Sequence, residues 1–292
     1  MENIYSLIED KPATEAPAQE QFDVEAWKEG KQKQRDEAYA LGDETALKVN
    51  SDPSALNGYL EVMARFPERT ASNCLLVFAQ RPSATRIGPK DYWDNEHALI
   101  KRGERGFTII EQGDAFTRDD GSLGSYFNTV RVFDEAQTTA RKIHPRRYQE
   151  GNVVTALVKT AKPRIVAADD LQGELAVYDR DSETLHLQKG LDQSQIFWAL
   201  ASELAQSEFA HSDKNWSREA YFDRAELAAA VLAKRYGIGA PFGDAPAPAP
   251  RDAEPKDIRS ALSDVQAAAK AISRQAALEL DRPKEREQAH AR

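Results

Sequence analysis

Aromatic and cationic side chains alternate between residues 57 and 110, and a mixture of these two kinds can bind nucleic acid. Aromatic rings accept stacked bases of any identity, while lysine and arginine follow the phosphates of a flexible strand. We therefore predict a surface for flexible nucleic acid in this segment. The candidate DNA-binding residues are Asn73, Gln80, Arg81, Arg86, Trp93, Lys101, Arg102 and Arg105.

Several of these side chains have a structural use that competes with binding. Trp93 can stack on a base, or it can close the core beside Tyr92. Asn73 and Gln80 are seven residues apart, so one helix face carries both amides. That face either meets a strand of nucleic acid or caps helix ends, and the sequence leaves both uses open.

Three cations and two glycines share the segment 101–106. A tight turn there would present backbone N–H groups and the side chains of Lys101, Arg102 and Arg105 to a phosphate together. A solvated loop would have the same composition. We favour phosphate contact.

In their order along the chain, these residues resemble a known family. Phe66 follows a helical apolar run, Asn73 precedes Gln80 by seven residues, and Trp93 and the basic 101–106 block follow the Pro-x-Ala-Thr turn at 82–85. This order is similar to the N-terminal single-stranded-DNA-binding domain of ArdC-type antirestriction proteins, in the version found in LtrC-like proteins of conjugative elements. The family's Tyr-Ser before the Asn-containing helix is Thr70-Ala71 here, which removes one aromatic ring.

The resemblance implies a function and a second domain. It implies a single-stranded DNA-binding accessory protein of a bacterial conjugative or mobile element, with a role in antirestriction. The family continues with a zincin-like metallopeptidase unit. There, two histidines one helical turn apart hold zinc, and the glutamate between them acts as the base.

In the helix equivalent to that zinc-binding helix, this chain reads Ser202-Glu203-Leu204-Ala205-Gln206. The glutamate is kept, and Ser202 and Gln206 replace the histidines. Glu226 resembles the third-ligand region of the later helix. Because serine and glutamine are poor zinc ligands, we predict a pseudo-metallopeptidase with no catalytic residue, no metal and no other cofactor.

Two rival interpretations stay open. His186, His211 and Glu226 could form a rearranged metal site, which would make the chain a metal-dependent peptidase. Alternatively, the chain is an interaction scaffold whose DNA binding has decayed, because residues 57–112 hold eight Lys or Arg against seven Asp or Glu.

Composition limits the choice of function. The formal charge of −9 over 292 residues would repel nucleic acid, so binding requires a local basic surface. The single cysteine, Cys74, excludes an internal disulfide and is expected in the core. The longest apolar runs are shorter than a membrane span and the N-terminus lacks a signal peptide, so we expect a cytoplasmic protein with no membrane partner.

Periodicity and composition predict an α+β fold in six segments, and the resemblance implies which two of them are the DNA-binding and zincin-like domains. They are a disordered N-terminus (1–21), a DNA-binding domain of helices and a small antiparallel sheet (22–135), a basic linker (136–150), a zincin-like domain (151–238), an Ala/Pro linker (239–254) and a C-terminal amphipathic helix (255–282). The basic linker either follows DNA or is simply solvated.

Three local expectations complete the prediction. Residues 23–49 should form a helix pair broken near Gly42, and Ser72 should cap the helix that ends before Pro82. The final helix carries a heptad stripe from Ile258 to Ala276. This stripe should either pack back on the body or bind a second helix, by self-association or from a partner.

Overall fold

A computed structural model describes residues 23–118, 120–144, 146–239 and 245–282. The predicted disordered segment 1–21 lies outside these ranges. Within them, the fold is α+β, as the sequence predicts. None of the described helices is both long and apolar enough to cross a membrane.

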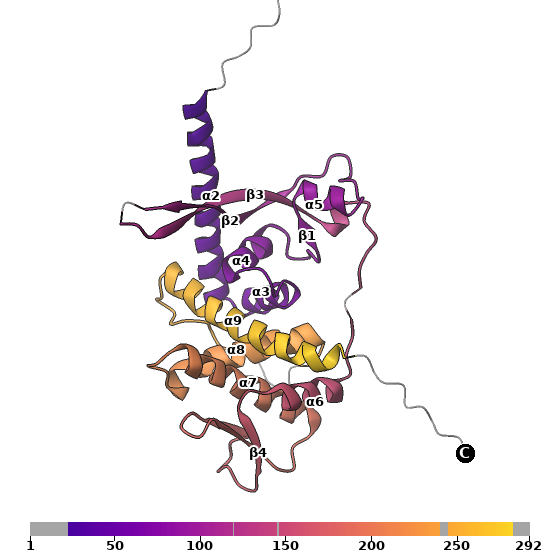
Figure 1. Ribbon diagram of the computed structural model, residues 1–292, viewed down its shortest axis with the longest axis vertical. Coiled ribbons are helices and arrows are strands. Elements are labelled where there is room, and N and C mark those ends of the chain that lie inside the picture. Colours follow the sequence, from indigo (N-terminus) through magenta and orange to yellow (C-terminus); the bar gives the residue numbers. More distant parts are fainter. Residues whose placement is uncertain (1–22, 119, 145, 240–244, 283–292) are drawn as a thin grey trace, which may run out of the picture.

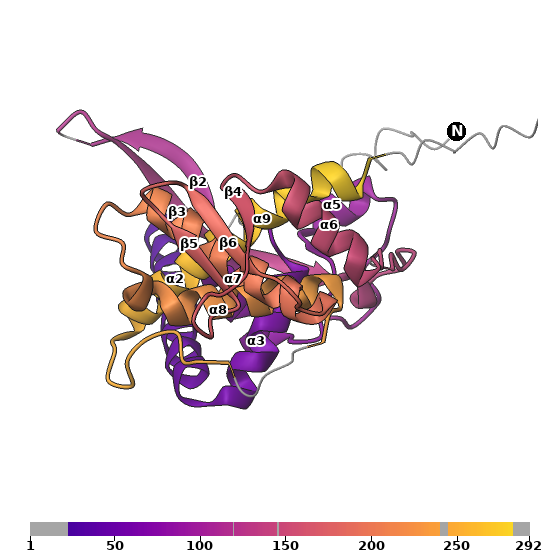
Figure 2. The same cartoon turned by 90° about the horizontal axis from the view of Figure 1, so that it is seen from below.

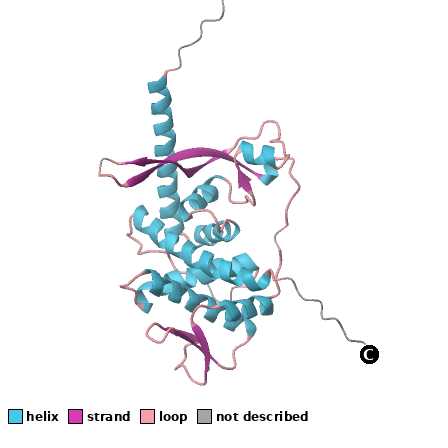
Figure 3. Cartoon of the chain, viewed as in Figure 1, coloured by secondary structure: helices cyan, strands magenta, loops and turns pink. Residues whose placement is uncertain are grey.

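The chain forms two halves that meet at the last helix (Figures 1 and 3). The first half contains α2 (Val24–Ser51), α3 (Pro53–Arg65), α4 (Ala71–Gln80), β1 (Ile87–Gly88), α5 (Lys90–Asn95), β2 (Phe107–Thr117), β3 (Leu123–Asp134) and the short η1 (Glu135–Gln137). The second half contains α6 (Glu150–Thr160), β4 (Arg164–Ala168), β5 (Ala176–Asp179), β6 (Thr184–Gln188), α7 (Gln193–Ser212) and α8 (Arg218–Tyr236), and α9 (Pro255–Leu280) follows.

Each half carries a small three-stranded sheet. The first has the order β1-β3-β2 and is antiparallel, with Phe107 opposite Val132. A register shift lies between Gln112 and Ala115, and the outer part of this hairpin projects from the body (Figure 2). The second sheet has the order β4-β6-β5, in which β4 and β6 are parallel.

Two local predictions in the first half are wrong. The segment 24–51 is a single helix, α2, because Gly42 lies buried inside it, where the helix passes close to Leu76 of α4. Helix α4 starts after Thr70, whose hydroxyl accepts a hydrogen bond from the Asn73 backbone N–H, so Thr70 and not Ser72 is its cap. In contrast, Asp52 caps α3 through the Ser54 N–H, as Asp-Pro predicts.

The core is continuous across both halves. Cys74 is buried in it, as predicted, and so is Phe66. Burial also raises the pKa of the Cys74 thiol to about 12, so this cysteine stays protonated and unreactive near neutral pH.

Helix α9 packs back on the body. It lies between α2 and α4 on one side and α6 to α8 on the other (Figure 1). The heptad stripe is therefore buried inside the molecule, including Ile258, Leu262 and Val265. This packing is the first of the two expectations for 255–282.

Two buried amides fix α9 and the segment before it. Gln266 of α9 donates from Nε2 to the carbonyl oxygens of Phe66 at 3.2 Å and Arg69 at 3.0 Å, just beyond the end of α3. At the end of α2, Asn50 donates to the Pro250 carbonyl at 3.0 Å and accepts from the Ala249 N–H at 3.0 Å. The described part of the Ala/Pro linker is thus tied to the first half.

We expect Gln266→Ala to lower the free energy of unfolding by about 1–3 kcal/mol, because it leaves buried carbonyl groups without a donor. Urea denaturation followed by circular dichroism measures this change. Gln275→Ala, a half-buried position on the same helix, is the control and should change stability by less than about 0.5 kcal/mol. Equal effects of the two substitutions would contradict the role given to Gln266.

Candidate nucleic-acid surface and zincin-like centre

The amides of Asn73 and Gln80 pair with the edge of strand β2. Asn73 donates to the Ile110 carbonyl at 2.7 Å and accepts from the Ile110 N–H at 2.9 Å. Gln80 pairs in the same way with Thr108, at 2.8 and 2.9 Å. One helix face does present both amides, and their hydrogen bonds take the place of those that a neighbouring strand would make with β2. Asn73 is buried, so the prediction that its amide faces DNA is wrong. Gln80 is exposed, so its contact with DNA stays a prediction.

Trp93 is fully buried, with 0% of its surface exposed. Its indole N–H lies 3.0 Å from the Gly88 carbonyl oxygen and 3.1 Å from that of Phe133, and its ring meets Tyr92 edge-on. A buried ring cannot stack on a base. The predicted stacking role of Trp93 is wrong, and the alternative of core closure is what the structure has.

Arg81 and Arg86 lie beside carboxylates. The Arg86 guanidinium bonds Glu135 and Glu96, each at 2.8 Å, and lies 4.9 Å from the centre of the Trp93 ring. Arg81 lies 3.6 Å from the Asp134 carboxylate, which is almost fully buried. Both cations are largely neutralised, so they hold β1 against the end of β3 and contribute little to a DNA surface.

The basic loop at 101–106 stays open to solvent. Lys101, Arg102 and Arg105 are exposed, and none of them forms an ion pair with a described residue. Lys101 does donate from Nζ to the Ala136 carbonyl at 2.8 Å, which attaches the loop to the residues after β3. Gly103 has a φ of +85°, a backbone conformation that favours glycine. These three cations remain available for phosphate contact.

A second exposed surface combines α2 with the β2–β3 hairpin, and sequence analysis missed it. The first half of α2 projects past the body and crosses the hairpin (Figure 1). We define the α2–hairpin surface as the exposed Trp27, Lys28 and Lys31 and the half-buried Arg35 of α2, with the exposed Asn128 and Arg131 of β3.

This surface brings rings and cations together. Trp27 is 50% exposed, and the Lys31 ammonium lies 6.0 Å from its ring centre. With Lys28, Arg35 and Asn128, these two residues line a cleft of about 680 Å³. A second cleft, of about 540 Å³, lies between Lys31 and Arg131.

The signal for this surface is present in the sequence. Residues 27–35 hold four cations and one acid beside Trp27, a local excess in a chain of net charge −9. Nothing in the sequence indicates that residues 126–131 of the hairpin lie against this helix, because about a hundred residues separate the two segments. Only the tertiary fold brings them together.

The four residues of the degenerate zincin-like site meet between α7 and α8. Ser202 donates to the Glu226 carboxylate at 2.7 Å. The Glu203 carboxylate accepts from the Tyr178 N–H at 2.7 Å and from Arg218 at 2.5 Å. Gln206 accepts from the Trp216 indole N–H at 2.9 Å and donates to the Arg218 carbonyl at 3.2 Å.

This network does not fit a metal ion. Glu203 is 4% exposed, and its burial raises its pKa above the ordinary range, while the Arg218 guanidinium opposes that rise. A guanidinium therefore supplies the positive charge beside the carboxylate. Among the described residues, no three His, Cys, Asp or Glu side chains gather so that they could hold a metal. His211 instead contacts the Ser207 carbonyl and Glu183, so the rearranged site is not formed.

One known protein has a similar fold, although comparison of sequences alone finds no relative. No family model and no curated protein match the sequence. The metal-free crystal structure of the antirestriction protein ArdC from plasmid R388 aligns with a TM-score of 0.52 and 16% identity, over 72% of this chain and 85% of that one. The chain has the ArdC fold. The Mn(II)-bound structure of ArdC aligns with a TM-score of 0.47 and 15% identity over the same shares.

We expect Arg218→Ala to destabilise this ArdC-like chain by about 3–5 kcal/mol at neutral pH, because it leaves a buried carboxylate unpaired. Without Arg218 the pKa of Glu203 rises further. A carboxyl with a raised pKa favours the folded state only when it is protonated, so the loss should grow as pH increases above about 4.5, the ordinary glutamate value.

Urea denaturation at pH 4.5 and pH 7.5 measures this pH dependence. Lys214→Ala removes an exposed cation just before the same helix and is the control. A loss that is constant between the two pH values would show that Glu203 and Arg218 are not coupled.

Proposed function

We propose that the chain is a non-catalytic single-stranded DNA-binding protein that acts in antirestriction. The observation that carries this proposal is the cleft of about 680 Å³ in which the exposed Trp27 ring lies beside Lys28, Lys31 and Arg35. This arrangement has the two components that unpaired strands require, a flat ring for the bases and cations for the phosphates.

Binding at this surface is not expected to depend on base sequence. Ring stacking and phosphate contacts do not distinguish one base from another. The rings at the far end of the hairpin extend the stacking platform, since Phe116 and Tyr126 stack with 4.4 Å between their centres and Tyr126 is 54% exposed. Unpaired DNA is favoured over duplex, because duplex bases are already stacked on one another.

The second half supports a non-catalytic role. A peptidase of the zincin class needs a metal-bound water beside its glutamate. In this chain the equivalent Glu203 is bonded to Arg218 and to the Tyr178 N–H. The positions on either side hold a hydroxyl and an amide that already have partners in Glu226 and Trp216.

Antirestriction is the part of the proposal that rests on the comparison. The structure with the same fold is described as the antirestriction protein ArdC of plasmid R388. A protein that coats an unpaired strand would keep nucleases and restriction enzymes from it during transfer. This role requires broad affinity for unpaired DNA, which agrees with a surface made of rings and cations.

Trp27→Ala should weaken binding of a labelled oligothymidine by about 5- to 150-fold, the equivalent of losing one stacked base. Fluorescence anisotropy at two salt concentrations measures both the affinity and its salt dependence. Lys31→Ala and Arg35→Ala should each lower the slope of log affinity against log salt by about 0.7.

Tyr39→Ala is the matched control, since Tyr39 is a 45% exposed ring on the same helix that does not line the cleft. Equal effects of Trp27→Ala and Tyr39→Ala would move the site elsewhere. Salt-independent binding, or equal affinity for duplex, would overturn the proposed function.

A further inference from the structure

The segment that joins the two halves has the strongest local excess of positive charge. Residues 136–149 contain Arg141, Lys142, Arg146 and Arg147 and no Asp or Glu. The described residues from Thr138 to Gln149 form no helix or strand, and they run along one side of the molecule (Figure 1). The basic loop is attached to the start of this segment, because the Lys101 N–H bonds the Gln137 carbonyl at 2.9 Å.

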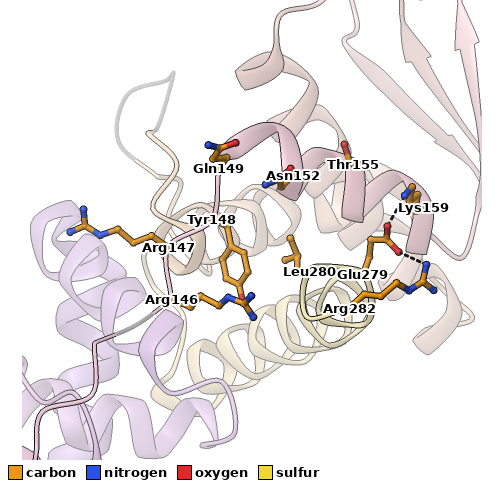
Figure 4. A pocket seen from close by; sticks show the side chains of 10 residues that line it. All are labelled: Arg146, Arg147, Tyr148, Gln149, Asn152, Thr155, Lys159, Glu279, Leu280 and Arg282. Carbon is orange, nitrogen blue, oxygen red and sulfur yellow. Dashed lines mark hydrogen bonds and ion pairs between the residues drawn. The ribbon is translucent and has the colours of Figure 1, made fainter. Parts of the chain in front are cut away.

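This basic segment ends in a groove of about 970 Å³. The groove lies between the segment, α6 and the end of α9 (Figure 4). Its cations come from three separate parts of the chain. Among its lining residues are Arg146, Arg147, Asn152, Lys159, Glu279 and Arg282.

Positive charge exceeds negative charge at the groove. Arg146 bonds Asp281 at 2.7 Å, while Lys159 and Arg282 share Glu279 at 2.6 and 3.1 Å. These three cations are still more than half exposed, so N–H donors remain for a ligand. Arg147 is exposed and forms no ion pair with any described residue.

Neutral donors complete the groove. Gln149 and Asn152 lie at the start of α6 and carry side-chain amides with no hydrogen bond to a described residue (Figure 4). The positive end of the α6 dipole adds to the attraction for an anion. The groove thus has four cations, two amides and two carboxylates around an open space. Donors spread in this way suit several phosphates along a chain better than one compact anion.

We propose that this groove binds the phosphodiester backbone of the same unpaired strand, as a second contact beyond the α2–hairpin surface. The inference rests on the proposed function. The two sites are linked through the basic loop. Lys31 and Arg131 line one cleft, and Arg131 donates to the Gly106 carbonyl at the end of that loop. The Lys101 N–H of the loop in turn bonds the Gln137 carbonyl at the start of the basic segment. A strand long enough to span both sites gains affinity because its second contact is intramolecular.

The test uses the full-length chain with oligothymidines of about 8 and about 40 nucleotides, of which only the longer is expected to reach both sites. The variant Arg147→Glu with Asn152→Asp lowers the net charge by three without removing a hydrogen bond between described side chains. Lys214→Glu with Asn215→Asp makes the same change of charge on the turn between α7 and α8 and is the control.

The groove variant should bind the longer strand at least about tenfold more weakly and the shorter strand unchanged, and the control should resemble the unsubstituted chain. An equal loss for both lengths, an equal loss in the control, or no loss would overturn the inference and leave the proposed function standing. If the unsubstituted chain binds neither strand, the proposed function fails and this inference fails with it.

A free nucleotide has the same phosphate chemistry, so dTMP is tested at constant ionic strength. The expected result is that dTMP binds no more tightly to the unsubstituted chain than to the groove variant. If dTMP binding depends on the groove while binding of the longer strand does not, the groove is a nucleotide site and the strand proposal is overturned.

Discussion

The packing of α9 between the two halves is the interaction on which the rest of the structure depends. This helix buries its apolar stripe against both halves at once, and its buried Gln266 holds the carbonyl groups that follow α3. Without it, both halves would expose apolar surface. Because the end of α9 also forms one wall of the basic groove, the same packing sets where the groove lies relative to the α2–hairpin surface.

The elements with strong local signals were predictable from the sequence. Helix α3 follows from Asp52-Pro53 and an apolar stripe, and the end of α8 follows from Gly237, which has the left-handed φ of +71°. The α+β class and the meeting of Ser202, Glu203, Gln206 and Glu226 also agree with the sequence. The ends of α3 and α8 depend on contacts between residues close in the sequence. The arrangement of the four residues in the centre came from the resemblance to a family.

Polar and aromatic side chains of the first half were harder to assign, because the same residue types serve binding and structure. Asn73 and Gln80 satisfy the open edge of β2, which otherwise would leave backbone groups unpaired. Trp93 fills the space between β1 and β3 and bonds a carbonyl from each. The sequence shows that an amide or an indole is present. Whether that group faces solvent or bonds the backbone is determined only by the fold.

The centre around Glu203 shows how this fold holds a buried carboxylate. A buried glutamate without a cation is costly, so a positive charge has to lie beside it. Arg218 supplies that charge from the start of α8, and it also bonds the Ala176 carbonyl at 3.4 Å, which ties α8 to strand β5. The same guanidinium thus holds the carboxylate of α7 and joins α7, α8 and β5 to one another. The second half can then serve as a rigid support for the basic groove.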